Sequence, residues 1–158
     1  AELLLLTTAR SAEATAATIK NGWMHTGDNA WKDEAGYIYF FDRKKDVIKR
    51  GGENVSSSEV EKVLMEHPAV LECAVIGVLD PIKDEAVKAF IVVRPGHSLS
   101  IEQITAHCAE RLAKFKVPQV IEMRDALPKT SIGKIEKKVL QRQERERAEA
   151  AARQPAKS

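Results

Sequence analysis

Two apolar runs restrict the fold of this chain more than any other feature of its sequence. The first, AVLECAVIGV, spans residues 69–78, and the second, VKAFIVV, spans residues 87–93. Short apolar runs that are continuous, or nearly so, are typical of buried strands. The residues between the runs, 80–85, are mostly polar and predict a loop. We therefore expect a sheet that contains both runs as buried strands.

Capping signals predict two helices beside these strands. Ser56 and Glu59 have the spacing of a capping box and stand before an apolar helical pattern. Ser100 and Gln103 repeat that spacing and predict a second helix, which runs to about Lys114. The segment PQVIEMR then predicts a last strand, and the sequence is helical and increasingly charged from residue 136 onward.

The N-terminal part of the chain predicts a helix and a hairpin. Residues 11–20 are rich in alanine, and the pair Asn21-Gly22 ends this helix. The segment WMHTGDNAWKDEAGYIYFFD predicts two short strands around a tight turn at 33–36. The strand DVIK follows a polar patch and ends in RGGEN, a turn in which two adjacent glycines permit positive φ.

Together these elements predict an α+β fold. The order βαββαβα, with a hairpin in front, gives a small few-stranded sheet with flanking helices on one face. Apolar alternation gives way to charge near residues 42–45. We therefore predict three regions: 1–42, which holds the hairpin; 43–140, which holds the sheet; and 141–158, a charged helical or disordered tail.

Composition excludes several classes of protein. The formal charge of the 158-residue chain is +2, which is too small to indicate nucleic-acid binding by itself. Cys73 and Cys108 form no CxxC pair, so neither a zinc site nor a disulfide framework is expected. The run LLLL at 3–6 is too short for a signal peptide or a membrane span. These features predict a soluble, cytoplasmic protein without metal ligands, and the missing initial methionine predicts a fragment.

The loop PKTSIGKI, residues 128–135, places Lys134 after a Ser/Thr/Gly segment. It is not a standard phosphate-binding loop, because that motif needs glycine where Pro128 stands and serine or threonine where Ile135 stands. Read alone, the loop favours a solvent-facing lysine near the start of a helix. The alternative is a lysine that delivers a positive charge to a reacting group.

Three motifs occur in a recognisable order: GWMHTGD at 22–28, DRKKDVIKRGGENVSSSEVE at 42–61 and PKTSIGK at 128–134. Residues 13–140 resemble the adenylate-forming superfamily, which includes acyl-CoA synthetases, firefly-type luciferases and peptide-synthetase adenylation domains. The segments RGGENVSSSEVE, DEAVKAFIVV and AKFKVP are most similar to the acyl-CoA ligase branch, both crotonobetaine/carnitine-CoA ligases and fatty-acyl-CoA ligases.

The resemblance implies a reaction in two steps. ATP, with Mg²⁺, adenylates a carboxylic acid, and the thiol of coenzyme A then displaces AMP. It also implies that 1–42 is the end of a larger N-terminal adenylation domain and that 43–140 is a mobile C-terminal lid. A homodimer of the full enzyme is a further expectation. Since the main ATP and acyl pockets belong to the larger domain, we expect this chain alone to be inactive.

The resemblance gives roles to four residues around the nucleotide. Lys134 corresponds to the catalytic lysine of the adenylation step, where an ammonium offsets charge on the phosphoryl oxygens. Asp28 corresponds to the aspartate that accepts hydrogen bonds from both ribose hydroxyls, with Thr26 in the same pocket. Arg43 corresponds to an arginine near the ribose and phosphates. Without the family register, Asp28 is equally compatible with a turn and Arg43 with a solvated hairpin.

Three further residues are implied for the second step. Lys45 falls at the hinge about which the lid rotates, where many members have aspartate. Gly52 corresponds to a glycine beside the pantetheine tunnel, and Lys49 to a lysine that reaches the active site in the second orientation. A plain turn glycine explains Gly52 almost as well.

Two functions of other classes compete with this interpretation. The chain could be a stand-alone, non-catalytic lid-like module that acts with a partner synthetase in trans. Nucleic-acid binding through 43–50 is less favoured, because acidic residues interrupt the patch and stacking aromatics are missing from it.

Overall fold

The two apolar runs form the long antiparallel pair of a five-stranded sheet in the computed structural model, which describes residues 11–153. They are β7 (Val70–Asp80) and β8 (Asp84–Val93). The other edge of β8 pairs in parallel with β9 (Val120–Met123). At one position, Arg50↔Asp84, it also pairs antiparallel with β5 (Val47–Arg50). Strand β6 (Glu53–Ser56) completes the sheet against β5. The predicted α+β class is confirmed, and β6 is a strand that the sequence analysis missed.

The turn between β7 and β8 is shorter than the predicted polar loop. Asp80 and Asp84 are cross-strand partners, which leaves only residues 81–83 in the turn. The carboxylate of Asp80 accepts hydrogen bonds from the backbone N–H groups of Ile82 and Lys83, and these bonds lower the pKa of Asp80. Asp84 takes a left-handed conformation with φ of 61°.

We expect the Asp84→Gly substitution to raise the free energy of unfolding by about 0.5 kcal/mol, because glycine removes the steric cost of positive φ. Urea denaturation measures the change. The matched substitution Asp80→Gly removes the side chain that caps the same turn and is expected to lower stability. A lower stability of Asp84→Gly than of the unchanged chain would contradict this prediction.

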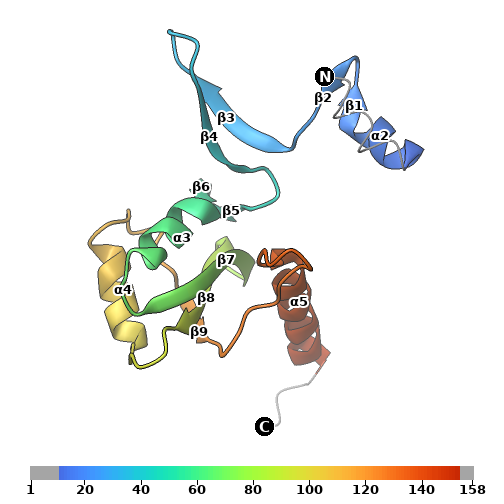
Figure 1. Cartoon of the computed structure of the whole chain (residues 1–158). Helices are drawn as coiled ribbons and strands as arrows, with labels where there is room; N and C mark the ends of the chain where they lie inside the picture. The colour runs from blue at the N-terminus through green and yellow to red at the C-terminus, as the bar shows by residue number, and fades with distance from the viewer. Residues whose placement is uncertain (1–10, 154–158) are drawn as a thin grey trace. The chain divides into compact units, whose positions relative to one another are not determined.

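Both faces of the sheet are buried, which explains why the apolar runs are continuous rather than alternating. On one face, α3 (Ser57–Met65) and α4 (Ile101–Ala109) cover alternate strand residues (Figure 1). On the other face, Ala74, Ile76 and Phe90 pack with Leu127 and with Leu140 of α5 (Lys137–Arg153). The prediction of helices on one face only is therefore wrong, since α5 lies on the opposite face.

The predicted capping signals are real but unequal. Ser100 and Gln103 form both reciprocal bonds of a capping box at the start of α4, which ends at Ala109 instead of near Lys114. Ser56 caps α3 by accepting from the backbone N–H of Glu59. The Glu59 carboxylate pairs with Lys116, at 2.7 Å, and so connects α3 to the segment that follows α4.

Helix α5 runs without a break across the predicted boundary at residue 140. Leu140 is fully buried, and Glu144 in the next turn pairs with Lys88 of β8 at 2.7 Å. Residues 141–153 thus continue a helix that packs on the sheet, because one side of it carries partners for the sheet. In the described part of the chain, no helix has the length and apolar character that a membrane crossing requires. The apolar run at 3–6 and the last five residues lie outside the described residues.

The chain divides into two units, Ala1–Lys45 and Asp46–Ser158, and the sheet belongs to the second. The first unit holds α2 (Ala12–Thr18), a small pair of strands, β1 (Ile19–Lys20) and β2 (Trp23–Met24), and the predicted hairpin, β3 (Asp28–Lys32) and β4 (Ile38–Arg43). Asn21 and Gly22 both have positive φ and form the turn between β1 and β2. They therefore make a hairpin, the structure that Asn-Gly most favours. The three predicted regions stay a prediction.

Candidate active-site residues

Lys134 lies on a tight hairpin between β9 and α5. Lys129 and Ile135 form an antiparallel bridge at its base, and Thr130 N–H donates to the Lys134 carbonyl at 2.8 Å. Gly133, with φ of 79°, supplies the left-handed residue that a three-residue hairpin loop requires. The Lys134 side chain is exposed beside this turn.

The backbone of this loop is not arranged to hold a phosphate. The N–H groups of Thr130, Gly133 and Glu136 all donate to carbonyl oxygens of the loop itself, at 2.8–2.9 Å. The N–H of Lys134 donates to the Thr130 hydroxyl at 3.2 Å. Phosphate-binding loops instead point several free N–H groups at the anion. The hairpin therefore presents one ammonium group.

Lys49 and Gly52 lie together on the hairpin of β5 and β6. Gly51 and Gly52 have φ of 55° and 85°, so this turn requires glycine at both positions. A side chain at Gly52 would meet open space, because no atom lies within 4 Å of a Cβ built there. The Lys49 side chain is exposed, and its backbone N–H donates to the Glu85 carboxylate at 2.7 Å.

Asp28 and Arg43 are brought together in the first unit. They are cross-strand partners at the open end of the β3–β4 hairpin, and Arg43 Nε lies 3.7 Å from Asp28 Oδ1. The Thr26 hydroxyl accepts from Asp28 N–H at 3.2 Å. Between them, Gly27 has φ of 78° and accepts from Lys44 N–H. The segment Thr26–Asp28 is thus a fixed turn that presents the Asp28 carboxylate to solvent.

Lys45 is an exposed residue of the turn that follows β4, and the boundary between the two units falls directly after it. The predicted site residues are therefore divided. Thr26, Asp28, Arg43 and Lys45 belong to the first unit, and Lys49, Gly52 and Lys134 to the second.

The structure adds Glu85 and Gly77, which sequence reasoning missed. A Cβ on Gly77 would lie 2.8 Å from the Glu85 side chain, so this glycine leaves the space in which that carboxylate lies. From there Glu85 reaches across to β5 and accepts from Lys49 N–H. A glycine inside an apolar strand was the available signal, since it often marks a close approach.

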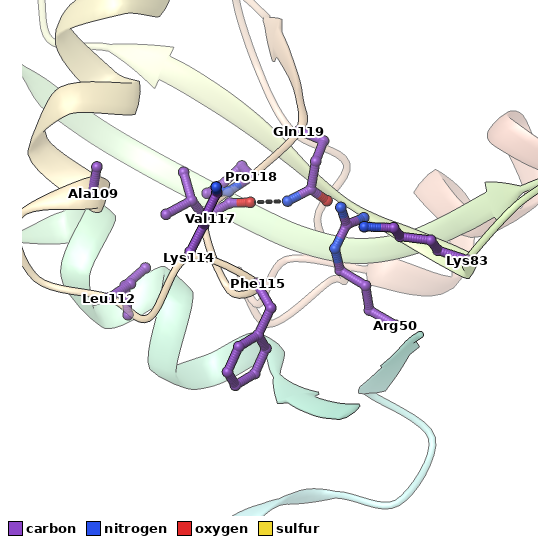
Figure 2. A pocket seen from close by; sticks show the side chains of 9 residues that line it. All are labelled: Arg50, Lys83, Ala109, Leu112, Lys114, Phe115, Val117, Pro118 and Gln119. Carbon is purple, nitrogen blue, oxygen red and sulfur yellow. Dashed lines mark hydrogen bonds between the residues drawn. The ribbon is translucent and has the colours of Figure 1, made fainter. Parts of the chain in front are cut away.

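A pocket of about 690 Å³ opens beside the β5–β6 hairpin (Figure 2). Arg50 and Lys83 enter it from β5 and from the β7–β8 turn, while the segment after α4 supplies Lys114 and apolar side chains that include Phe115. One guanidinium nitrogen of Arg50, Nη1, is buried without a hydrogen-bond partner among the described residues. Three cations and an apolar wall suit an anionic ligand that also has an apolar part.

Neither cysteine is a nucleophile in this arrangement. Burial raises the pKa of Cys73 to about 12, with a further contribution from the nearby Glu61 carboxylate. Burial likewise raises the pKa of Cys108 to about 11. Both thiols stay protonated at neutral pH and pack in the core.

Comparison with known proteins agrees with the motifs. Residues 59–134 match a family described as AMP-binding enzyme C-terminal domain. A crotonobetaine/carnitine–CoA ligase of Citrobacter koseri is 50% identical over 129 residues, which are 81% of this chain and 25% of that protein. The chain thus spans about a quarter of the length of the curated relatives it matches.

Solved structures give the same result. A fatty acyl CoA synthetase of Mycobacterium tuberculosis is 42% identical with a TM-score of 0.65, over 83% of this chain and 26% of that one. The o-succinylbenzoate CoA synthetase of Bacillus subtilis, solved with an acyl-adenylate, is 38% identical with a TM-score of 0.74, over 84% and 26%. The chain therefore carries an AMP-binding enzyme C-terminal domain. The resemblance to the adenylate-forming superfamily, and to its acyl-CoA synthetases, that the motifs indicate is confirmed.

Proposed function

We propose that this chain is the C-terminal part of an AMP-forming acyl-CoA synthetase. In the first step a carboxylate oxygen attacks the α-phosphorus of ATP, the bond to pyrophosphate breaks, and an acyl-adenylate forms. In the second step the sulfur of coenzyme A attacks the acyl carbon, AMP leaves with the bonding electron pair, and the thiol proton is released. The observation that carries this proposal is Lys134, an exposed ammonium on a hydrogen-bonded hairpin within the matched domain.

In the adenylation step Lys134 would offset the charge that builds on the phosphoryl oxygens as an anionic acid approaches. Lysine suits this task because it is a compact point charge on a flexible stem. Asp28 would accept from the ribose hydroxyls, with its backbone fixed by Thr26. Arg43 would stand beside the ribose and phosphates, where its pairing with Asp28 supports the proposal. Mg²⁺ would arrive with ATP.

In the thioester step Lys45 would be the hinge, and Lys49 and Gly52 would approach coenzyme A. The open space at Gly52 supports a close passage of the pantetheine arm. The neighbouring pocket of Arg50, Lys83 and Lys114 would favour the phosphates of coenzyme A over an uncharged thiol.

Exposed apolar side chains on the first unit support a contact with an adenylation domain. Its β3–β4 hairpin exposes large side chains on both faces, among them Trp31, Tyr37, Ile38 and Phe40, each at least 58% exposed. The rings of Trp31 and Tyr39 stack on this hairpin, with their centroids 4.2 Å apart. Exposed apolar surface of this kind marks a contact with another protein surface. We propose an adenylation domain as that partner, a small carboxylic acid as substrate, homodimerisation of the whole enzyme, and a cytoplasmic location.

A domain exchange tests the proposed function. We define the test ligase as the Citrobacter koseri relative in which this chain replaces the C-terminal quarter that it matches. We expect carboxylate-dependent ATP–pyrophosphate exchange and thioester formation from the test ligase, and neither reaction from the chain alone. A folded test ligase that catalyses neither step would contradict the proposal.

The same experiment separates the alternative function. Mixing this chain with the Citrobacter koseri ligase from which that quarter has been removed tests action in trans. Activity that returns only on mixing, and not in the test ligase, would favour a stand-alone module that works with a partner synthetase.

A further inference from the structure

Ion pairs at both feet join the hairpin that carries Lys134 to other elements of its unit. The residue at one foot, Lys129, forms an ion pair with Glu72 of β7. At the other foot, Lys137 Nζ lies 2.7 Å from Glu61 Oε1 and donates to the Ser57 hydroxyl at 2.9 Å. The two lysines stand five residues before and three residues after Lys134, so the ion pairs flank it on both sides.

The groups that receive Lys137 belong to the fixed part of the domain. Ser57 is fully buried in the first turn of α3. The same carboxylate oxygen of Glu61 that meets Lys137 also accepts from Val75 N–H of β7, at 2.7 Å. Lys137 therefore joins the start of α5 to both α3 and the sheet, and its side chain is only 20% exposed.

Apolar packing fixes the base of the hairpin but not the direction of its tip. Leu127 is buried in the core cluster beneath α5, and Ile135 packs against the same cluster. Beyond these residues, the loop at 131–134 is exposed. The side chains at its two feet, Lys129 and Lys137, form ion pairs with other elements of the unit.

We propose that Glu61 with Lys137, and Glu72 with Lys129, position Lys134 for the adenylation step by holding this hairpin in one orientation. The inference rests on the proposed role of Lys134 in adenylation. All four are positioning residues, which act through the hairpin and touch no reacting atom. Lys137 is the stronger contact, because its partners are more buried than the pair of Lys129 and Glu72.

The chain offers a matched control in Lys138. This neighbouring lysine is exposed at the same turn of α5 and, in the described part of the chain, contacts neither Glu61 nor Ser57. Lys137→Met and Lys138→Met remove the same charge from adjacent positions, so they differ only in the link to Glu61 and Ser57. Lys137→Arg keeps the charge and the reach and is expected to restore the link.

Hydrogen exchange on the full 158-residue chain tests the physical part of the inference. We expect Lys137→Met to speed exchange of the Thr130 and Glu136 amides, which close the hairpin, about tenfold, while the core amides of β8 are unchanged. Lys138→Met and Lys137→Arg are expected to leave all of these rates unchanged. Equal rates in Lys137→Met and Lys138→Met would overturn the inference whatever the chain does in catalysis.

The adenylation activity of the test ligase shows whether these contacts position Lys134 for catalysis. We expect Lys137→Met to lower kcat for adenylation about tenfold at unchanged KM for ATP, and to spare thioester formation from a supplied acyl-adenylate. Faster exchange with unchanged adenylation would overturn the positioning role and leave the proposed function intact. Failure of Lys134→Ala to affect adenylation would instead overturn the proposed function. If Lys137→Met does not fold, Glu72→Gln tests the other foot by the same two measurements, with the same outcomes deciding.

Discussion

Replacing Lys134 with alanine is expected to lower the rate of adenylate formation in the test ligase by about 10²–10³-fold, or about 2.7–4 kcal/mol of transition-state stabilisation. The loss is this large because the hairpin presents one ammonium group and its backbone N–H groups are committed to the loop itself. The other lysine of the hairpin, Lys129, is paired with Glu72 at its foot and so does not replace the charge. Carboxylate-dependent ATP–pyrophosphate exchange measures the effect.

The comparison of the two half-reactions decides how the loss is interpreted. Thioester formation from a supplied acyl-adenylate is expected to keep its rate in Lys134→Ala, because the sulfur attacks the acyl carbon in that step and the phosphorus is not attacked. Lys138→Ala, which removes a charge four residues away, is expected to leave both steps unchanged. An equal loss of both steps in Lys134→Ala would show that the lysine has a structural role and would count against a role in adenylation.

The centre of the sheet could be predicted because β7 and β8 are long and buried on both sides. β7 and β8 match the apolar runs, and the missing alternation in them is explained by core clusters on both faces. The position of α5 could not be predicted in the same way. Its sequence is mostly charged, so it resembles a solvated helix, and the few residues that bind it to the sheet, such as Leu140 and Glu144, show no clear period.

In the candidate site, local turns could be predicted from sequence because all the residues that form each turn lie within one short motif. The turn at Gly27 that fixes Asp28 and the turn at Gly133 that presents Lys134 both depend on neighbouring residues, which a sequence displays directly. The residues that hold these turns in place are distant in sequence. Glu61 meets Lys137 across 76 positions, and Glu85 meets Lys49 across 36, so only the fold reveals them.

The last prediction concerns a nearly buried charge beneath α5. Lys88 is 7% exposed and lies 2.8 Å from Glu122 and 2.7 Å from Glu144. We expect Lys88→Met to lower the free energy of unfolding by about 2–3 kcal/mol, because two shielded carboxylates lose their shared cation. The loss falls below that of a fully isolated pair because Arg147 still contacts both carboxylates. Urea denaturation at neutral pH measures it, and Arg142→Met, which breaks an exposed pair with Glu146, is the control with an expected change below about 0.5 kcal/mol.

The dependence of stability on pH in the acid range gives an independent test of the ion pairs between Lys88, Glu122 and Glu144. Burial by itself raises the pKa of Glu122, but hydrogen bonds from Lys88, Arg147 and Arg124 outweigh it and lower that pKa from 4.5 to about 2. A carboxyl whose pKa is lowered on folding stabilises the fold above its unfolded pKa and loses that contribution as pH falls toward its folded pKa. Stability of the unchanged chain should therefore fall between about pH 4.5 and pH 2. Lys88→Met should flatten this fall, because Glu122 then titrates closer to its unfolded value. A neutral-pH loss without any flattening would mean that Lys88 contributes through packing on Phe90, whose ring centroid lies 4.9 Å from Nζ, and not through Glu122.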